Sequence, residues 1–127
     1  MGRTLTDGDA STPGGGAVVV LSHAFWQRHF GADPLIVGKR ILVRGYPCEV
    51  VGVLRDGFAG LDVLPHDFWL PLTLSPQIEE GADLFGPEHP TRLEIVGRLK
   101  PDVTRKSAQA VLTTWAQRIT AGRRDDE

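Results

Sequence analysis

The pattern of apolar and polar positions between Val18 and Leu54 predicts the centre of the fold. Val18–Leu21 is a short run of β-branched and aliphatic residues that follows a group of glycines, so we expect a buried strand there. Ser22 can cap a helix start, and Gly31 is a natural helix end. Between these two residues, apolar and aromatic side chains recur at helical spacing, namely Phe25, Trp26, His29 and Phe30. The segment therefore predicts a strand followed by a short helix.

Two further strands are predicted over residues 41–44 and 49–54, because both are rich in β-branched residues. In the second strand, Val51 and Val53 share one face and Gly52 lies on the other. Residues 45–47 are Gly, Tyr and Pro, which is turn chemistry, since glycine adopts positive φ and proline cannot donate to a ladder. We expect the two strands to pair as an antiparallel hairpin.

The second half of the chain is less regular. Residues 67–72 predict a short strand, and residues 73–91 predict a long loop with one helical turn at 76–80. Residues 92–99 alternate between apolar and polar side chains, which predicts a further strand.

The last predicted element is the clearest helix of the chain. Thr104 can cap it, and Gly122 is expected to end it. One face carries an apolar stripe of Ala108, Val111, Leu112, Trp115 and Ile119. Taken together, the elements predict an α+β fold: a small, mostly antiparallel or mixed sheet with two main helices packed on it.

Composition narrows the class of protein. The chain has 127 residues, 41% hydrophobic and 24% charged, which is typical of one globular domain. A net charge of −2 gives no electrostatic reason to bind nucleic acid. The single cysteine, Cys48, cannot form an internal disulfide. The chain shows neither a membrane-spanning run of roughly 20 apolar residues nor a signal-peptide pattern.

The candidate residues for a metal site, a phosphate-binding loop or a catalytic nucleophile do not have the spacing that these sites require. Asp7 and Asp9 begin like a calcium loop but lack its later glycine and glutamate. The four histidines (His23, His29, His66 and His89) have no zinc-ligand spacing. Ser22 and His23 are sequence neighbours, which does not make a catalytic dyad, and Cys48 resembles a small apolar core residue. Residues 14–16, three glycines, precede a strand instead of following one, unlike a P-loop. We therefore predict no catalytic, cofactor-binding or metal residues, and no cofactor.

Several short motifs occur in an order and spacing that resemble a known family. They are GRTLTDGD at 2–9, LS-x-x-FW-x-x-x-FG at 21–31, DP-x-x-VGK at 33–39, I-x-V-x-G at 41–45, VVGV with a following GF within 50–58, DFWLPL at 67–72 and IVGRLKP at 95–101. The chain resembles the periplasmic core domain of MacB-like ABC transporter permeases of the FtsX/MacB type. Its likeness is greatest to the branch of long orphan permeases with duplicated transmembrane sets.

The resemblance implies a non-enzymatic, extracytoplasmic domain of a bacterial inner-membrane permease, whose fragment alone is soluble. Such a domain moves with the transmembrane helices of its parent while a separate ATPase subunit hydrolyses ATP, and it meets a periplasmic adaptor or partner protein. The implied division is a flexible lead-in (1–16), a small inserted lobe (17–72), a long loop (73–91), and a return strand and helix of the larger lobe (92–121). The chain would then be an excised piece or a truncated gene product.

Two alternative functions remain open from the residues alone. Trp26, Trp69 and Trp115, with the loop 73–91, could form a ligand- or peptide-binding module, although core packing is the commoner use of tryptophan. A metal-dependent enzyme built on Asp7, Asp9 and a histidine is the other alternative. Because the apolar stripe of the last helix has no evident cover, a homodimer is one expected assembly.

Overall fold

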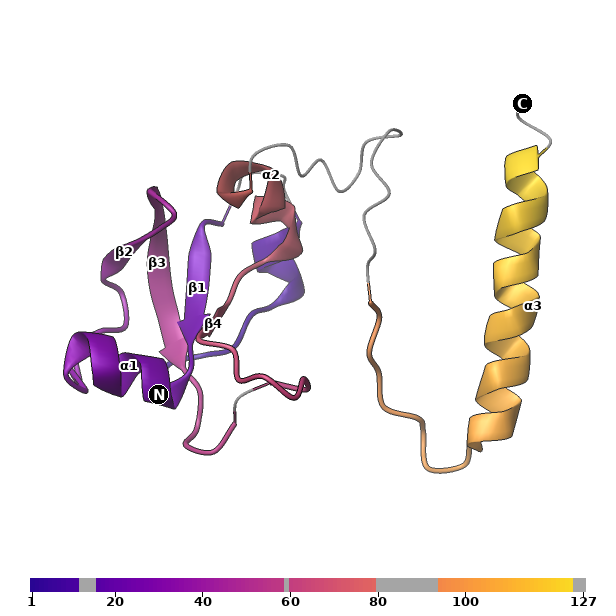
Figure 1. Ribbon diagram of the computed structural model, residues 1–127, viewed down its shortest axis with the longest axis horizontal. Coiled ribbons are helices and arrows are strands. Elements are labelled where there is room, and N and C mark those ends of the chain that lie inside the picture. Colours follow the sequence, from indigo (N-terminus) through magenta and orange to yellow (C-terminus); the bar gives the residue numbers. More distant parts are fainter. Residues whose placement is uncertain (12–15, 59, 80–93, 125–127) are drawn as a thin grey trace. The chain divides into compact units, whose positions relative to one another are not determined.

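The computed structural model describes residues 1–11, 16–58, 60–79 and 94–124, and the side chains of residues 122–124 are not described (Figure 1). The chain divides into two compact units, Met1–Thr91 and Arg92–Glu127.

The N-terminal unit is built on a four-stranded mixed sheet with strand order β2-β3-β1-β4. Its strands are β1 (Val18–Leu21), β2 (Arg40–Val43), β3 (Tyr46–Val53) and β4 (Phe68–Trp69). β1 runs parallel to β3, whereas the β2–β3 and β1–β4 pairs are antiparallel. The other elements among the described residues of this unit are helix α1 (His23–Phe30), helix α2 (Ser75–Ile78) and two 3₁₀ turns (Asp7–Ala10 and Leu72–Leu74). The α+β prediction is confirmed.

The predicted hairpin is confirmed, but its turn lies earlier than expected. Arg44 and Gly45 both have positive φ, 48° and 83°, as a type I′ turn requires. Tyr46 and Pro47 therefore belong to β3 and not to the turn, where residues 45–47 were expected. Pro47 faces Leu42 one pair beyond the turn. Since antiparallel pairs alternate, its nitrogen points away from β2 and no ladder bond is lost.

A bulge in β3 explains its long buried stretch. β1 pairs Val19 with Val50 but Val20 with Gly52, so Val51 is an extra residue in β3. All four residues from Val50 to Val53 are buried, whereas simple alternation would expose every second one.

The first residues of the chain lie beside β3. An isolated antiparallel bridge joins Gly2 to Gly52, and the Arg3 nitrogen donates to the Val51 oxygen at 2.9 Å. A methyl group on Gly52 would overlap the Arg3 carbonyl oxygen and lie 3.0 Å from the Arg3 carbonyl carbon. A methyl group on Gly2 would lie 2.8 Å from the Gly52 Cα. The two backbones therefore approach so closely that only glycine fits at both positions.

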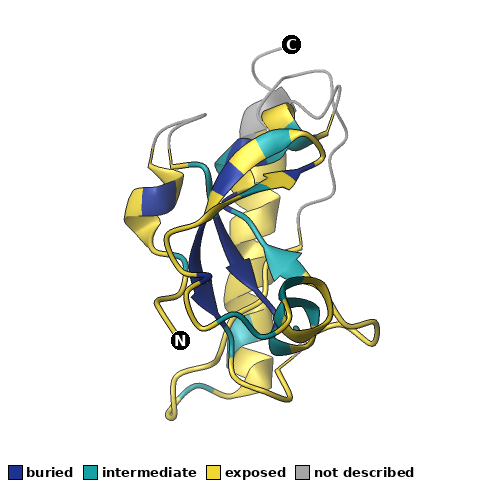
Figure 2. Ribbon diagram, turned by 90° about the vertical axis from the view of Figure 1, so that its left-hand side faces the viewer, coloured by how far each residue is buried: buried dark blue, intermediate teal, exposed yellow. Residues whose placement is uncertain are grey.

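The core of the unit is made mainly by strand residues, and partly buried side chains of α1 and α2 pack against it; Figure 2 shows the buried residues concentrated in the strands. It contains Val19, Leu21, Ile36, Val43, Cys48, Val50, Val53 and Leu74. As predicted, the Ser22 hydroxyl caps α1 by accepting from the Phe25 nitrogen at 3.1 Å, and Gly31 ends the helix with φ 58°. Trp26 is half-buried against this core, and its Nε1 donates to the Asp33 carbonyl at 2.9 Å.

The C-terminal unit contains helix α3 (Arg105–Arg124). Thr104 caps it, as predicted, by accepting from the Ser107 nitrogen at 3.2 Å. The expected end at Gly122 is wrong, because the helix continues to Arg124. Glycine lowers helix propensity, but it breaks a helix only where a left-handed conformation is adopted.

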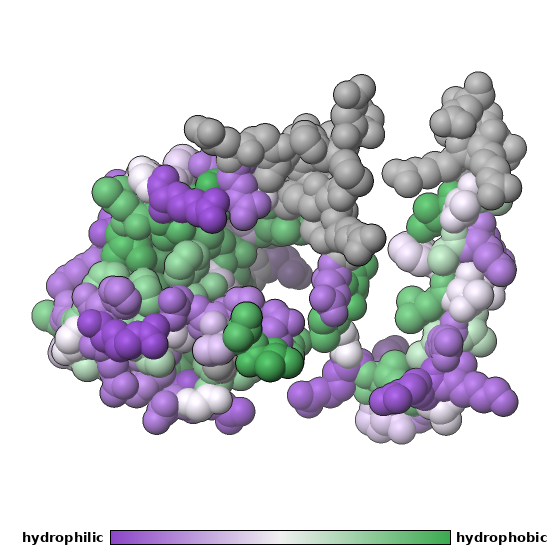
Figure 3. Space-filling view, viewed as in Figure 1, coloured by the Kyte–Doolittle hydropathy of each residue, from purple (hydrophilic) through white to green (hydrophobic). Residues whose placement is uncertain are grey.

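The strand expected over residues 92–99 is not found in its described part, residues 94–99. Alternation sets which side chains share a face, but a strand also needs a neighbour for its backbone groups, and no described strand pairs with this segment. The predicted apolar stripe of α3 does form. No described residue of this unit covers Val111, Leu112 or Trp115, which are 68%, 62% and 56% exposed. Apolar residues reach the surface of both units (Figure 3).

Candidate functional site

The carboxylate of Asp9 is held in a network that takes up its acceptor sites. Arg3 binds it through two nitrogens, Nη1 to Oδ2 at 2.7 Å and Nη2 to Oδ1 at 2.8 Å. The Thr6 nitrogen and hydroxyl donate to Oδ2 at 2.8 and 2.9 Å. The Arg3 guanidinium, followed by the Thr6 backbone bond, holds the pKa of Asp9 well below its usual range. Asp9 therefore ties the first turn together, which argues against the calcium-loop alternative built on Asp7 and Asp9.

The histidines have separate surroundings. The His66 Nε2 lies 2.5 Å from Asp62 Oδ2, and His23 Nδ1 lies 3.5 Å from Asp56 Oδ1. The ring of His29 stacks on Phe25 with centroids 4.4 Å apart, while His89 lies outside the described residues. Among the described residues, no group of three or more His, Cys, Asp or Glu side chains could hold a metal ion.

The two candidate nucleophiles have structural roles. The Ser22 hydroxyl is engaged as the cap of α1. The Cys48 side chain is fully buried in the core, and burial raises the pKa of its thiol, so the nucleophilic thiolate is disfavoured. The interpretation of Cys48 as a small apolar core residue is confirmed.

A polar cleft of about 420 Å³ lies at the start of α1. Its charged and polar lining comprises Ser22, His23, Arg28, Asp56, His66 and Asp67. Arg28 Nη2 and Asp67 Oδ1 form an ion pair at 2.7 Å, and both side chains are about half exposed. The cleft thus consists of paired charges near solvent, which contribute little binding energy to a ligand.

The tryptophans do not form one common groove in the N-terminal unit. Trp26 packs against the core, whereas Trp69 and Phe58, with ring centroids 5.8 Å apart, line an apolar hollow of about 290 Å³. Leu5, Val20 and Leu54 complete its apolar lining. Trp115 belongs to the C-terminal unit. Phe58 thus folds back toward the sheet, since Trp69 is in β4.

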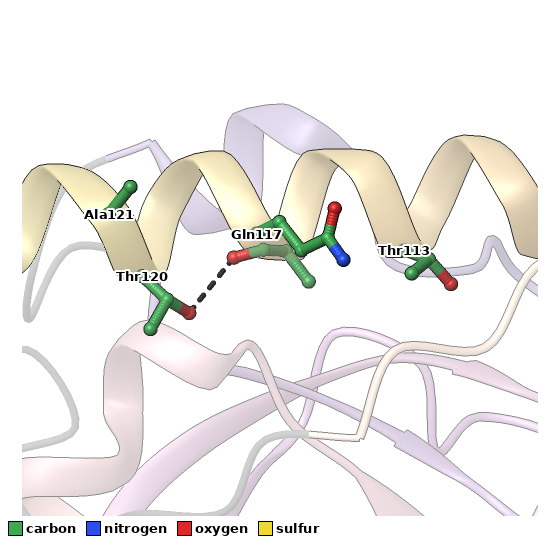
Figure 4. Close-up of a pocket in the computed structure, with 5 residues that line it drawn as sticks. Thr113, Gln117, Thr120 and Ala121 are labelled. Carbon is green, nitrogen blue, oxygen red and sulfur yellow. Dashed lines mark hydrogen bonds between the residues drawn. The ribbon is translucent and has the colours of Figure 1, made fainter.

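A surface hollow on α3 has polar and small side chains, drawn in Figure 4. Thr113, Gln117, Thr120 and Ala121 line it together with Ala116, whose carbonyl accepts from the Thr120 hydroxyl at 2.9 Å. Because all five residues belong to one helix, the hollow is an open groove between neighbouring side chains and cannot enclose a ligand.

Sequence reasoning did not find a second apolar groove of the N-terminal unit. The rings of Phe25, Phe30 and Phe68 line this groove, which has a volume of about 560 Å³. β2 contributes Ile41, Leu42 and Val43, and Arg44 follows at the hairpin turn. The sequence shows only that each of these segments is apolar. Whether the segments lie side by side depends on the order of the strands in the sheet, which cannot be inferred from a single sequence.

A match to a known family agrees with the motifs and the mixed sheet. It also agrees with the structural roles of Asp9, Ser22 and Cys48. Residues 1–115 match the MacB-like periplasmic core domain, and the chain belongs to this family. The resemblance found in the motifs is confirmed.

Curated relatives are similar over most of the chain. The pyoverdine export ATP-binding/permease protein PvdT of Pseudomonas syringae pv. tomato is 32% identical over 121 residues, covering 94% of this chain. The PvdT proteins of Pseudomonas savastanoi pv. phaseolicola and Pseudomonas syringae pv. syringae are each 29% identical over 119 residues. The chain spans 17% of the length of these relatives. No solved structure matches, and no described helix is long and apolar enough to cross a membrane.

Proposed function

We propose that this chain is the extracytoplasmic domain of an inner-membrane ABC-type permease. It couples ATP-driven motion of the transmembrane helices to export or to engagement of a periplasmic partner, without chemistry of its own. Membership of the MacB-like periplasmic core family and similarity to proteins named as ATP-binding/permease exporters support this proposal. The ATPase subunit would act on the domain through the parent's transmembrane helices, and a periplasmic adaptor would receive the motion.

The observation that carries the proposal is that residues of the family motifs have structural roles. Within GRTLTDGD, Asp9 binds Arg3, and Ser22 of the next motif caps α1. Gly52 of VVGV allows the Gly2 backbone to approach. These residues thus maintain the shape of the domain, which supports a role without chemistry of its own. Close-packed interiors have low compressibility and transmit strain, which is what a mechanical coupling element requires.

The test compares export with ATP hydrolysis in the full-length permease that contains this chain. Gly52→Ala should displace the first residues from β3, whereas Gly8→Ala places its methyl at an ordinary 3.7 Å from the Thr6 hydroxyl and serves as the control. We expect Gly52→Ala to retain ATP hydrolysis and to lose export. Wild-type export from a permease in which this domain is shown to be distorted would contradict the coupling role.

A ligand-binding role is the second candidate, favoured by the apolar hollow beside Trp69. Its volume of about 290 Å³ is at the lower limit for small-molecule sites. Most of the loop 73–91, which this alternative also invoked, lies outside the described residues. If the role is binding, Trp69→Leu should abolish export while leaving the unfolding transition nearly unchanged. Equal export by this variant would favour mechanical coupling.

A further inference from the structure

The loop between β3 and β4 presents large apolar side chains to solvent. Leu61 and Leu64 are each 76% exposed, and Val63 is 100% exposed. Single exposed apolar residues are common on proteins, but three within four positions concentrate apolar side chains in one short exposed loop. We call this segment, residues 61–64, the apolar loop.

Contacts at the base of the apolar loop hold it in this form. His66 Nε2 approaches Asp62 Oδ2 at 2.5 Å, and the His66 ring packs edge-on against Trp69 with centroids 6.3 Å apart. Gly60 is in the left-handed region with φ 104°, and a methyl group on it would lie 2.8 Å from the His66 ring. The loop is thus preorganised with its apolar side chains outward, which lowers the entropic cost of binding a partner.

The same unit carries a complementary surface, the groove lined by Phe25, Phe30 and Phe68. Its volume of about 560 Å³ is open to solvent, and Leu42 at its margin is 72% exposed. Arg44 adds a positive charge at the margin, on the tip of the β2–β3 hairpin. An apolar groove beside a cation fits an apolar segment that carries an acidic residue.

The apolar loop is such a segment, because Asp62 lies between Leu61 and Val63. We propose that the apolar loop of one copy inserts into the three-phenylalanine groove of a second copy, with Asp62 facing Arg44. Charge favours this occupant over an anionic membrane, since Asp62 and the 87% exposed Asp56 side chain would be repelled by it.

The size of the contact sets its strength. Three inserted side chains bury far less than the roughly 1,200–2,000 Å² of a stable interface, so the contact is weak and transient in solution. Tethering two copies to one membrane or one complex would raise their effective concentration and populate the contact. This inference goes beyond the coupling role and does not depend on it.

Sedimentation velocity of the full chain over a wide concentration range tests the proposal. We expect concentration-dependent association that Val63→Asp abolishes. Leu35→Asp, at another 74% exposed apolar position, is the matched control and should behave as wild type. Arg44→Asp and Asp62→Arg should each weaken association about tenfold, and the double variant should restore most of it, because it reverses the pair.

A cross-linking experiment tests the same contact without the Asp62→Arg variant, whose loop could be distorted. Copies with Val63→Cys are mixed with copies with Leu42→Cys and treated with a short bismaleimide, with Leu35→Cys replacing Leu42→Cys as the control. A cross-linked heterodimer formed only by the first mixture supports the contact. A strictly monomeric wild type, association that survives Val63→Asp, or equal cross-linking in the control overturns it.

Discussion

Replacing Gly52 by alanine tests the close approach between the first residues and β3. The added methyl would overlap the Arg3 carbonyl oxygen and lie 3.0 Å from the Arg3 carbonyl carbon and nitrogen, so the segment 1–3 must move. This movement breaks three hydrogen bonds. The Arg3 nitrogen donates to the Val51 carbonyl and the Val53 nitrogen to the Met1 carbonyl, both at 2.9 Å. The Met1 amino group donates to the Val53 carbonyl at 3.0 Å. At about 0.5–1.5 kcal/mol each, their loss destabilises the unit by about 2–4 kcal/mol.

The assay is urea and thermal unfolding followed by circular dichroism. A loss of that size lowers the melting temperature of a unit of this length by about 8–30 °C. Gly8→Ala meets only an ordinary contact and controls for the general effect of alanine on the unfolded chain. If Gly52→Ala and Gly8→Ala have free energies of unfolding within about 0.5 kcal/mol of each other, the segment 1–3 does not lie against β3 as described and the reasoning fails.

Three further predictions concern Asp9, Trp26 and Cys48. The folded-state pKa of Asp9 is lowered, so its stabilisation is present above the unfolded pKa of about 3.9 and is lost as pH falls further. Asp9→Asn should therefore remove part of the acid-induced fall in melting temperature, and an unchanged pH profile would refute this. Trp26→Ala should cost about 2–3 kcal/mol in denaturant unfolding, less than for a fully buried tryptophan, because Trp26 is half-buried. Cys48 should react with a thiol reagent only under unfolding conditions, and rapid native reaction would contradict its burial.

Local features of the fold were predictable, because their signals lie within a few residues. The helix cap at Ser22, the helix end at Gly31 and the β2–β3 hairpin follow from neighbouring residue types. The turn was misplaced because Arg44 adopts a positive φ, which sequence reasoning reserved for glycine. The strand expected over residues 92–99 shows the opposite error, in which a clear side-chain pattern lacks a backbone partner.

Non-local features were not predictable from one sequence. The parallel pairing of β1 with β3 joins segments separated by α1 and β2, and no residue type encodes it. The spacing of Asp9 from Asp7 suggests a metal ligand, whereas its pairing with Arg3 depends on how the first turn closes. The groove of Phe25, Phe30 and Phe68 required the sheet order for the same reason.

The bridge between Gly2 and Gly52 also bears on the order of folding. The β2–β3 hairpin closes through a two-residue turn and is expected to form early, since local contacts form fastest. The bonds that hold Met1 to Val53 span 52 residues, so their closure waits until β3 is synthesised and ordered. Residues that leave the ribosome before the hairpin therefore join the sheet after it. In the folded protein, the same segment is expected to open first in hydrogen exchange, ahead of the strands that it covers.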